Sequence, residues 1–155
     1  MDKPMTQTIK VTASAELDTQ THTIRLRRSM PVPAMKVFEA WTTPDIVAKW
    51  WDPTGVPLRS CEIDLRPGGA FRFVNDEHGD GQAFSGTYRE IAPPDRLAFE
   101  AMGAQGLVLF SERDGRTDIV VSIVCASAEQ LAMYMEMGIV ENTGKTLDNL
   151  VAYLR

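Results

Sequence analysis

The chain has 155 residues, of which 44% are hydrophobic, and this length and composition predict one compact domain with its own core. The formal net charge is −5, and Lys and Arg form no cluster longer than Arg27-Arg28, which argues against a nucleic-acid partner. The first residues lack the pattern of a signal peptide, and no apolar run is long enough to cross a bilayer. We therefore expect a cytoplasmic protein with no membrane partner.

Residues 1–20 are mostly polar and stand apart from the rest of the chain. A short alternation at Ile9, Val11 and Ala13 fits either an extra edge strand or an N-terminal arm, and the sequence leaves both open. If it is a strand, it could pair with a second copy of the chain at the edge of a homodimer. The main domain is expected to span residues 21–155.

The main domain begins with a strand and two helices. Apolar residues alternate with arginines over residues 21–30, which predicts a half-exposed first strand. Residues 34–42 place apolar side chains at helical spacing. The sequence Thr43-Pro44-Asp45 is typical of a helix start, with a capping residue, a proline and an acidic first turn, so a second short helix is predicted to run to about residue 51.

Six further strands follow, joined by turns. Period-two alternation and turn residues, among them Gly68-Gly69 and Asp114-Gly115, predict short antiparallel connections. The predicted strands lie near residues 60–65, 71–73, 84–91, 97–101, 107–110 and 119–125. With the first strand, the sheet is expected to have seven strands.

From about residue 127 the hydrophobic period becomes helical, which predicts a long C-terminal helix. Gly138 and Gly144 lie inside it and each costs about 1 kcal/mol relative to Ala, so we expect a bend or break near them. The resulting order of elements is that of the helix-grip fold. The predicted fold class is α+β, with a seven-stranded curved antiparallel sheet, two short helices between its first two strands, and the long helix.

Several segments strengthen this interpretation through resemblance to a known family. The segments are VFEAWT at 37–42, AKWW at 48–51, EIDLRPGG at 62–69, GTYREI at 86–91 and TLDNL at 146–150. Together they resemble the family of homologues of the activator of the heat-shock-protein-90 ATPase, within the START-like (SRPBCC) superfamily. The resemblance covers about residues 24–154.

The resemblance implies a cavity between the curved sheet and the long helix. Similar proteins often carry a Gly-Trp pair just before the last motif, where this chain has Asn142-Thr143. A large interior aromatic is therefore missing, and the hollow is expected near Thr143. Because the superfamily includes lipid carriers, cyclases and co-chaperone domains, the resemblance implies no single substrate.

Aromatic and methionine side chains are the candidates for the cavity wall, although each is also a candidate for ordinary core. They are Trp50, Phe71, Phe73, Phe84, Phe99, Phe110, Met133 and Met137. Tyr88 shares the strand face of Phe84 and Gly86, so its hydroxyl is the preferred polar contact for a ligand. The alternation places Glu62 and Asp64 on the outer face of the sheet.

The sequence predicts no catalytic residue, metal site or cofactor. Neither His22 nor His78 lies in a triad or zinc-binding pattern. The run at 75–80 contains suitable cation ligands but lacks calcium-loop spacing, and is better explained as a turn. Cys61 and Cys125 are far apart and form no CxxC pattern, so we expect two small buried thiols.

Three functions remain open on the sequence. The favoured one is binding of a small hydrophobic or aromatic molecule, without catalysis. The second is an enzyme similar to polyketide cyclases or hydrolases, which would need a titratable group inside the cavity. The third is a chaperone-associated protein-binding module, for which the chain shows no docking segment, so no chaperone partner is expected.

Overall fold

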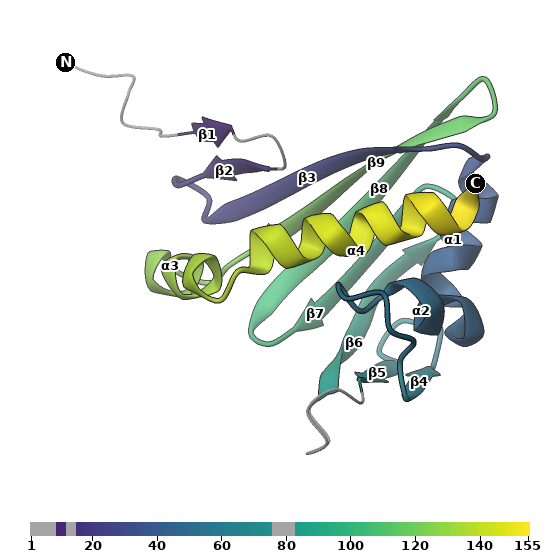
Figure 1. Cartoon of the computed structure of the whole chain (residues 1–155). Helices are drawn as coiled ribbons and strands as arrows, with labels where there is room; N and C mark the ends of the chain where they lie inside the picture. The colour runs from purple at the N-terminus through teal and green to yellow at the C-terminus, as the bar shows by residue number, and fades with distance from the viewer. Residues whose placement is uncertain (1–8, 12–14, 76–82) are drawn as a thin grey trace.

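The computed structural model describes residues 9–11, 15–75 and 83–155. In these residues the chain forms an α+β fold with a nine-stranded antiparallel sheet and four helices (Figure 1). The strand order across the sheet is β1-β2-β3-β9-β8-β7-β6-β5-β4. The first strand of the main domain therefore pairs with the last, while the remaining strands form a meander.

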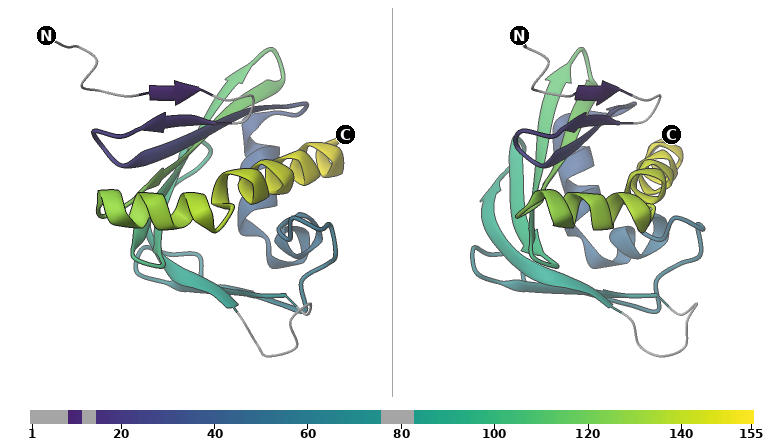
Figure 2. Two further views of the ribbon diagram at one scale, coloured as in Figure 1. Left: turned by 60° about the vertical axis from the view of Figure 1, so that its left-hand side comes forward. Right: turned by 90° about the vertical axis from the view of Figure 1, so that its left-hand side faces the viewer.

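Seven of the strands lie where the alternation predicts them. They are β3 (Thr23–Met30), β4 (Ser60–Ile63), β5 (Ala70–Val74), β6 (Ala83–Ala92), β7 (Arg96–Ala101), β8 (Ala104–Arg113) and β9 (Arg116–Val124). A β-bulge between Tyr88 and Glu90 interrupts the register of β6 with β7. Bulges increase local twist and bend. Figure 2 shows the resulting curved sheet, with all four helices on its concave side.

The expected count of seven strands was too low, because the N-terminal part contributes two more. These are β1 (Ile9–Val11) and β2 (Glu16–Asp18), with β2 pairing antiparallel to β3. Three-residue strands are too short to give a clear alternation, so pairing with β3 defines β2 better than its own sequence. β1 lies at the sheet edge, and residue Ala13 of the predicted alternation lies outside the described residues. Self-association through this edge stays a prediction.

Two short helices follow β3. Helix α1 (Ala34–Thr42) and helix α2 (Pro44–Trp50) meet at Thr43, whose extended backbone turns the chain between them. Pro44 occupies the start of α2, as its fixed φ favours. Thr43 holds the capping position, but its side chain makes no capping hydrogen bond.

The C-terminal region contains two helices, α3 (Ala128–Glu136) and α4 (Ile139–Leu154), so the predicted long helix is broken near one of the two glycines where a bend or break was expected. The break lies at Gly138, which has φ +78° and can adopt this left-handed conformation without the strain of a Cβ. Gly144 lies within α4. The two helices therefore lie at an angle to each other (Figure 2).

The core lies between α1, α2 and the concave face of the sheet. Phe38 of α1 packs on Phe110 of β8, with ring centroids 5.3 Å apart. Val108 and Ile119 beneath α1 are fully buried, and Trp50 of α2 is 1% exposed and donates its indole N–H to the Ala40 carbonyl. Each such side chain contributes about 1.5–3 kcal/mol through burial.

Both cysteines are free, Cys61 half-buried and Cys125 buried, and no disulfide links them. Among the described residues, no helix combines the length and hydrophobicity needed to span a membrane. His78 and most of the polar run at 75–80 lie outside the described residues.

Candidate functional site

A cavity of about 230 Å³ lies between the C-terminal helices and the concave face of the sheet. Its described walls come from α1, the chain after α2, strands β6 to β9, and helices α3 and α4. The lining residues are Trp41, Trp51, Pro53, Phe84, Phe99, Ala101, Met102, Ala104, Gln105, Gly106, Val121, Ile123, Tyr134, Ile139, Asn142, Thr143, Thr146 and Leu147. An apolar cavity of roughly 150 Å³ is enough to hold benzene, so this space is large enough for a small molecule.

The cavity exists because the sheet beneath it carries small side chains. Ala101, Ala104 and Gly106 occupy inward-facing positions on β7 and β8. Helix α4 packs against β3, α2 and α3, so it does not reach down to fill this part of the sheet. The cavity therefore has two causes, which are the small side chains on the sheet and the support of α4 by other elements.

Gly106 also fixes the position of an aromatic wall residue. A Cβ at Gly106 would lie 2.4 Å from the Phe99 ring, which therefore lies directly over the glycine. The two residues are cross-strand partners in β7 and β8. Because glycine has no side chain, the Phe99 ring can lie close to the sheet and the space above it stays open.

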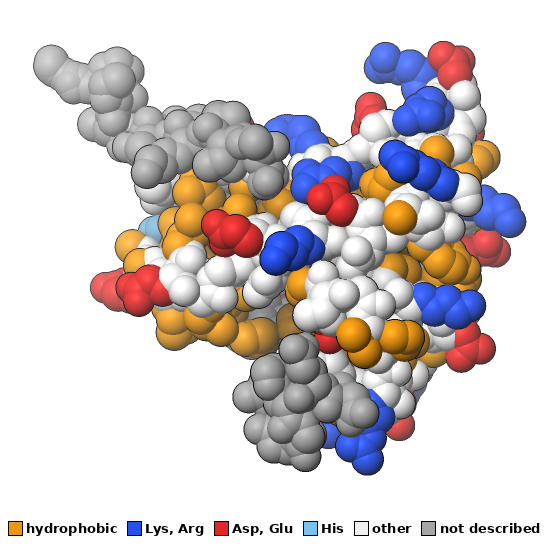
Figure 3. All heavy atoms as spheres, in the orientation of Figure 1, with side chains coloured by type: hydrophobic (Ala, Val, Ile, Leu, Met, Phe, Trp, Pro, Cys, Tyr) orange, Lys and Arg blue, Asp and Glu red, His pale blue; other side chains and the backbone are white. Residues whose placement is uncertain are grey.

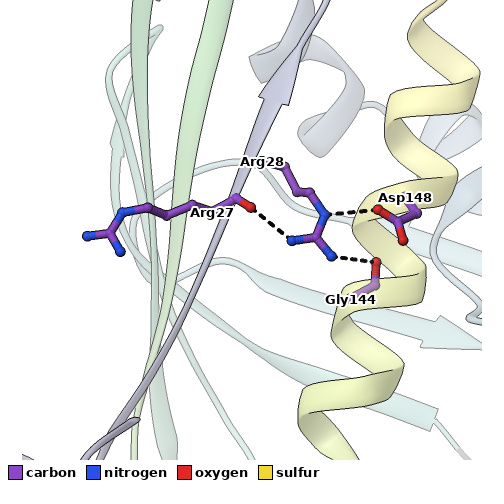
Figure 4. Close-up of polar contacts among 4 residues, drawn as sticks. All are labelled: Arg27, Arg28, Gly144 and Asp148. Atoms are coloured by element: carbon purple, nitrogen blue, oxygen red, sulfur yellow. Dashed lines mark hydrogen bonds and ion pairs between the residues drawn. The ribbon is translucent and has the colours of Figure 1, made fainter. Parts of the chain in front are cut away.

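Arg28 of β3 anchors α4 on one side (Figure 4). Its Nε lies 2.9 Å from Asp148 Oδ1, and its two terminal nitrogens donate to the carbonyls of Arg27, at 2.9 Å, and Gly144, at 3.4 Å. The Arg28 side chain is only 19% exposed. A planar guanidinium bound at several points defines the helix position more than a single surface ion pair would.

A second set of contacts anchors α4 to the end of α2. Thr146 Oγ1 donates to the Trp51 carbonyl at 2.9 Å, and Asn149 Nδ2 donates to the Asp52 carbonyl at 2.9 Å. These two side chains donate hydrogen bonds to carbonyls at the C-terminal end of α2, where carbonyls have no partner within the helix. Helix α4 is therefore held at both flanks, with the cavity beneath its first half.

One end of the cavity is aromatic. Trp51 contacts Phe84, with ring centroids 5.1 Å apart, and lies edge-on to Trp41 at 6.4 Å. The buried Trp41 Nε1 has no hydrogen-bond partner among the described residues, and its ring also lies edge-on to Trp50 at 5.0 Å. Edge-to-face packing of this kind stabilises an aromatic cluster beyond the area that it buries.

A smaller space of about 20 Å³ lies next to this wall. Phe71, Phe73, Tyr88 and Leu97 line it, and they also make up the adjacent core. The space holds about one water molecule at most, so it is an extension of the core and not a ligand site.

The cavity also has polar groups, most of them on the helices. The Tyr134 hydroxyl donates to the Met102 carbonyl at 2.8 Å and is therefore occupied. Burial, with a smaller contribution from neighbouring Cys125, raises the pKa of Tyr134. Asn142 and Thr143 on α4 add an amide and a hydroxyl to the wall.

The structure brings only part of the predicted set to the larger cavity. Phe84 and Phe99 line it, whereas Phe71, Phe73 and Tyr88 line the small space beside it. Trp50 and Phe110 are buried in the core and line neither space.

The two predicted methionines are placed away from the cavity. Met133 and Met137 are about half exposed, at 51% and 50%, and do not line it. Leu131 and Tyr134 are the buried residues of α3, and the two methionines lie off the face that these residues form. Figure 3 shows hydrophobic side chains gathered around α3, in the left half of the view.

Tyr88 is buried, but its hydroxyl does not reach the larger cavity. Burial, and secondarily Cys61, raises the pKa of this hydroxyl above its ordinary value of 10.0. Burial also raises the pKa of the Cys61 thiol to about 11, with smaller contributions from the carboxylates of Asp45 and Glu62. Glu62 and Asp64 are exposed, as the alternation predicts.

The sequence reasoning missed several wall residues. Trp41 and Trp51 were placed in helix faces without a cavity beside them, and Ala101, Ala104 and Gly106 were not considered. A signal was present for these three, since small residues occupy consecutive inward-facing positions of two paired strands. Thr143, near which the hollow was expected, lies on the wall.

Comparison with known proteins places the chain in a family. The family model described as Activator of Hsp90 ATPase homolog 1-like protein matches residues 31–155. The chain belongs to this family. No curated protein matches it.

Solved structures of similar proteins share the fold. Protein NE0264 from Nitrosomonas europaea is 25% identical, with a TM-score of 0.74 over 84% of this chain and 92% of that one. Protein Ms6760 from Mycobacterium smegmatis is 21% identical, with a TM-score of 0.78 over 95% and 98%. An AHSA1-like protein from Aeromonas hydrophila is 23% identical, with a TM-score of 0.61 over 84% and 95%. The α+β fold with a curved antiparallel sheet is thus that of the START-like superfamily, which is a ligand-binding fold in general.

Proposed function

We propose that this member of the Hsp90-activator-homologue family binds a small hydrophobic or aromatic molecule in the cavity beneath α4 and holds it without chemical change. The observation that carries the proposal is the cavity of about 230 Å³, whose described walls are mainly aromatic and aliphatic. Wall atoms that border empty space lack dispersion contacts on one side. A ligand of matching shape restores these contacts and moves its own apolar surface out of water, and both changes favour binding.

Holding is better supported than catalysis by the groups that line the described wall. Proton transfer needs a group that can change its protonation state near neutral pH. The phenol of Tyr134 donates a hydrogen bond to the Met102 carbonyl, and burial raises the pKa of this phenol. The chemistry of the wall therefore favours a carrier or sensor over the cyclase-like alternative.

The test is to fill the cavity and measure ligand binding. Ala104→Leu adds apolar volume inside the cavity, where Ala104 is buried on β8. We expect naphthalene to raise the melting temperature of the unaltered protein but not that of Ala104→Leu. At tenfold its Kd, a ligand that binds only the folded state stabilises it by about 1.4 kcal/mol. Thermal unfolding followed by circular dichroism measures the shift.

Ala70→Leu is the matched control, because Ala70 is exposed at the start of β5 and does not line the cavity. This variant should respond to naphthalene as the unaltered protein does. A screen of one-ring and two-ring aromatic compounds that stabilises neither protein would overturn the proposal. Equal stabilisation of all three proteins would place the binding outside the cavity and would also overturn it.

A further inference from the structure

The cavity-facing side of α4 carries a polar segment between two apolar ends. Ile139, Asn142, Thr143, Thr146 and Leu147 line the cavity and follow the helical spacing of three and four residues. Ile139 and Leu147 are apolar, and the groups between them are an amide and two hydroxyls. The helix therefore presents hydrogen-bonding groups to the middle of a space whose other described walls are mainly aromatic and aliphatic.

The hydroxyl of Thr143 differs from those of other helical threonines in the protein. Thr42 Oγ1 donates to the Phe38 carbonyl one turn earlier at 2.8 Å, and Thr146 Oγ1 donates to the Trp51 carbonyl at 2.9 Å. A helical Thr commonly satisfies its hydroxyl on a preceding carbonyl in this way. In the described part of the chain, the hydroxyl of Thr143 has no hydrogen-bond partner. Thr143 is half-buried on the cavity wall, so a ligand can reach this hydroxyl.

The aromatic wall has the opposite chemistry. Trp51, Phe84 and Phe99 present ring faces and edges, which favour contact with another flat aromatic molecule. The cavity thus has an aromatic side contributed by the sheet and the end of α2, and a polar segment contributed by α4. A ligand that matches both sides has a ring system with a hydrogen-bonding group on its edge.

Size and charge narrow the ligand further. The cavity volume of about 230 Å³ exceeds the roughly 150 Å³ that accommodates benzene, which favours one to two fused rings. The side chains that the described wall contributes are uncharged at neutral pH. An ionised ligand would lose its hydration without gaining a counter-charge there, which is costly.

We infer that the ligand is an uncharged one-ring or two-ring aromatic molecule with a hydroxyl or carbonyl on its edge, and that Thr143 binds this polar atom while the rings pack on Trp51, Phe84 and Phe99. The inference rests on the proposed function. It assigns Thr143 as a residue that determines specificity, with Asn142 at the exposed edge of the same segment.

Three probes with one ring system test the assignment. Naphthalene has no polar group, 2-naphthol has a neutral hydroxyl, and 2-naphthoate has a carboxylate. One net hydrogen bond corresponds to roughly threefold to tenfold in affinity. We expect 2-naphthol to bind that much more tightly than naphthalene, and 2-naphthoate to bind most weakly, in calorimetric or fluorescence titrations at pH 7.

Thr143→Val removes the hydroxyl while nearly preserving the shape of the side chain. The substitution should lower the affinity for 2-naphthol by roughly threefold to tenfold and leave the affinity for naphthalene unchanged within about twofold. Thr87→Val is the matched control, because Thr87 is exposed on β6 and does not line the cavity. The control should bind all three probes as the unaltered protein does. Circular dichroism verifies that both variants are folded.

The outcomes separate the inference from the function on which it rests. If naphthalene and 2-naphthol bind equally, or if Thr143→Val weakens both by the same factor, the inference is overturned while ligand binding in the cavity stands. Tighter binding of 2-naphthoate than of 2-naphthol would overturn the expectation of an uncharged ligand. If none of the three probes binds, the inference fails, and the screen of one-ring and two-ring aromatic compounds decides whether the proposed function stands.

Discussion

Strands β8 and β9 run beneath both the core and the cavity, and their two ends differ in how they are covered. At one end, Val108 and Ile119 are fully buried beneath α1. At the other end, Ala104 and Ile123 border the cavity. We call these the packed end and the hollow end of the concave face.

The difference shows that a cavity needs two conditions. The strands are continuous, and the same alternation directs side chains inward along their whole length. What changes is the side-chain size and the support of the helix above. Helix α1 packs directly on β8 and β9, whereas α4 is held by β3 and α2 and passes over the small residues Ala101 and Ala104. Small residues alone would have allowed the helix to move closer.

The largest expected effect comes from truncating one isoleucine at each end. Ile119→Ala should lower the free energy of unfolding by roughly 3–5 kcal/mol, because Ile119 is fully buried in close packing. Ile123→Ala should cost about 1–2 kcal/mol, because Ile123 is half-buried and already borders empty space. Urea unfolding of both variants measures the difference. Equal losses would mean that the two ends are packed alike.

A smaller effect is expected from a pair of inward-facing glycines. A Cβ at Gly86 would lie 2.0 Å from the Glu100 carbonyl oxygen, so Gly86→Ala must displace backbone and should cost about 2–3 kcal/mol. A Cβ at Gly106 would meet the Phe99 ring, which can move into the cavity. Gly106→Ala should therefore cost about 1 kcal/mol or less.

Ligand binding distinguishes these two glycine variants further. Gly106→Ala should lower the affinity for naphthalene, because it reduces the volume of the cavity. Folded Gly86→Ala should bind naphthalene normally, since Gly86 does not line the cavity. Titration at a temperature where both variants are folded makes the measurement. A Gly106→Ala variant that binds naphthalene unchanged would show that Phe99 does not move into the space.

The smallest effect concerns the thiols, which lie in different regions. Cys125 neighbours Tyr134 on the cavity wall, whereas Cys61 lies on β4 beside Tyr88. Burial, helped by Asp45 and Glu62, raises the pKa of Cys61 from 9.0 to about 11, so the folded state favours the neutral thiol. The stability from this shift is fully present below pH 9 and is lost as the pH rises toward 11.

The measurement is the urea midpoint at several pH values across this window, for the unaltered protein and for Cys61→Ala. The variant should lose less stability between pH 9 and 11 than the unaltered protein. Cys125→Ala is the matched comparison, since burial also raises the pKa of that thiol. If Cys61→Ala follows the same pH curve as the unaltered protein, the thiol is not perturbed as described.

Much of the fold could be predicted from the sequence because its signals are local. Alternation located the strands from β3 to β9, and Thr43-Pro44 located the corner between α1 and α2. Gly138 indicated the break that divides the predicted C-terminal helix into α3 and α4. The N-terminal alternation at Ile9, Val11 and Ala13 was left undecided and β2 was not predicted, because a three-residue strand depends on the neighbour that it pairs with.

The site was predicted less well, because its residues have no shared sequence signal. Aromatic content indicated Phe84 and Phe99 but equally indicated Trp50 and Phe110, which are core residues. Met133 was expected on the cavity wall from its residue type, yet it faces solvent, because Leu131 and Tyr134 form the buried face of α3. Local periodicity identifies the apolar face of a helix or strand, but not which part of the protein packs against that face.

The amino-acid sequence by itself determined the family, the order of most elements and which strand residues face inward, because alternation, turns and caps act over a few residues. Only the tertiary structure decided where the concave face is packed and where it is hollow. Arg28 and Thr146 hold α4 through partners about a hundred positions away in the chain, at Asp148 and the Trp51 carbonyl. Contacts over such separations set the height of the helix above the small residues of the sheet, and that height creates the cavity.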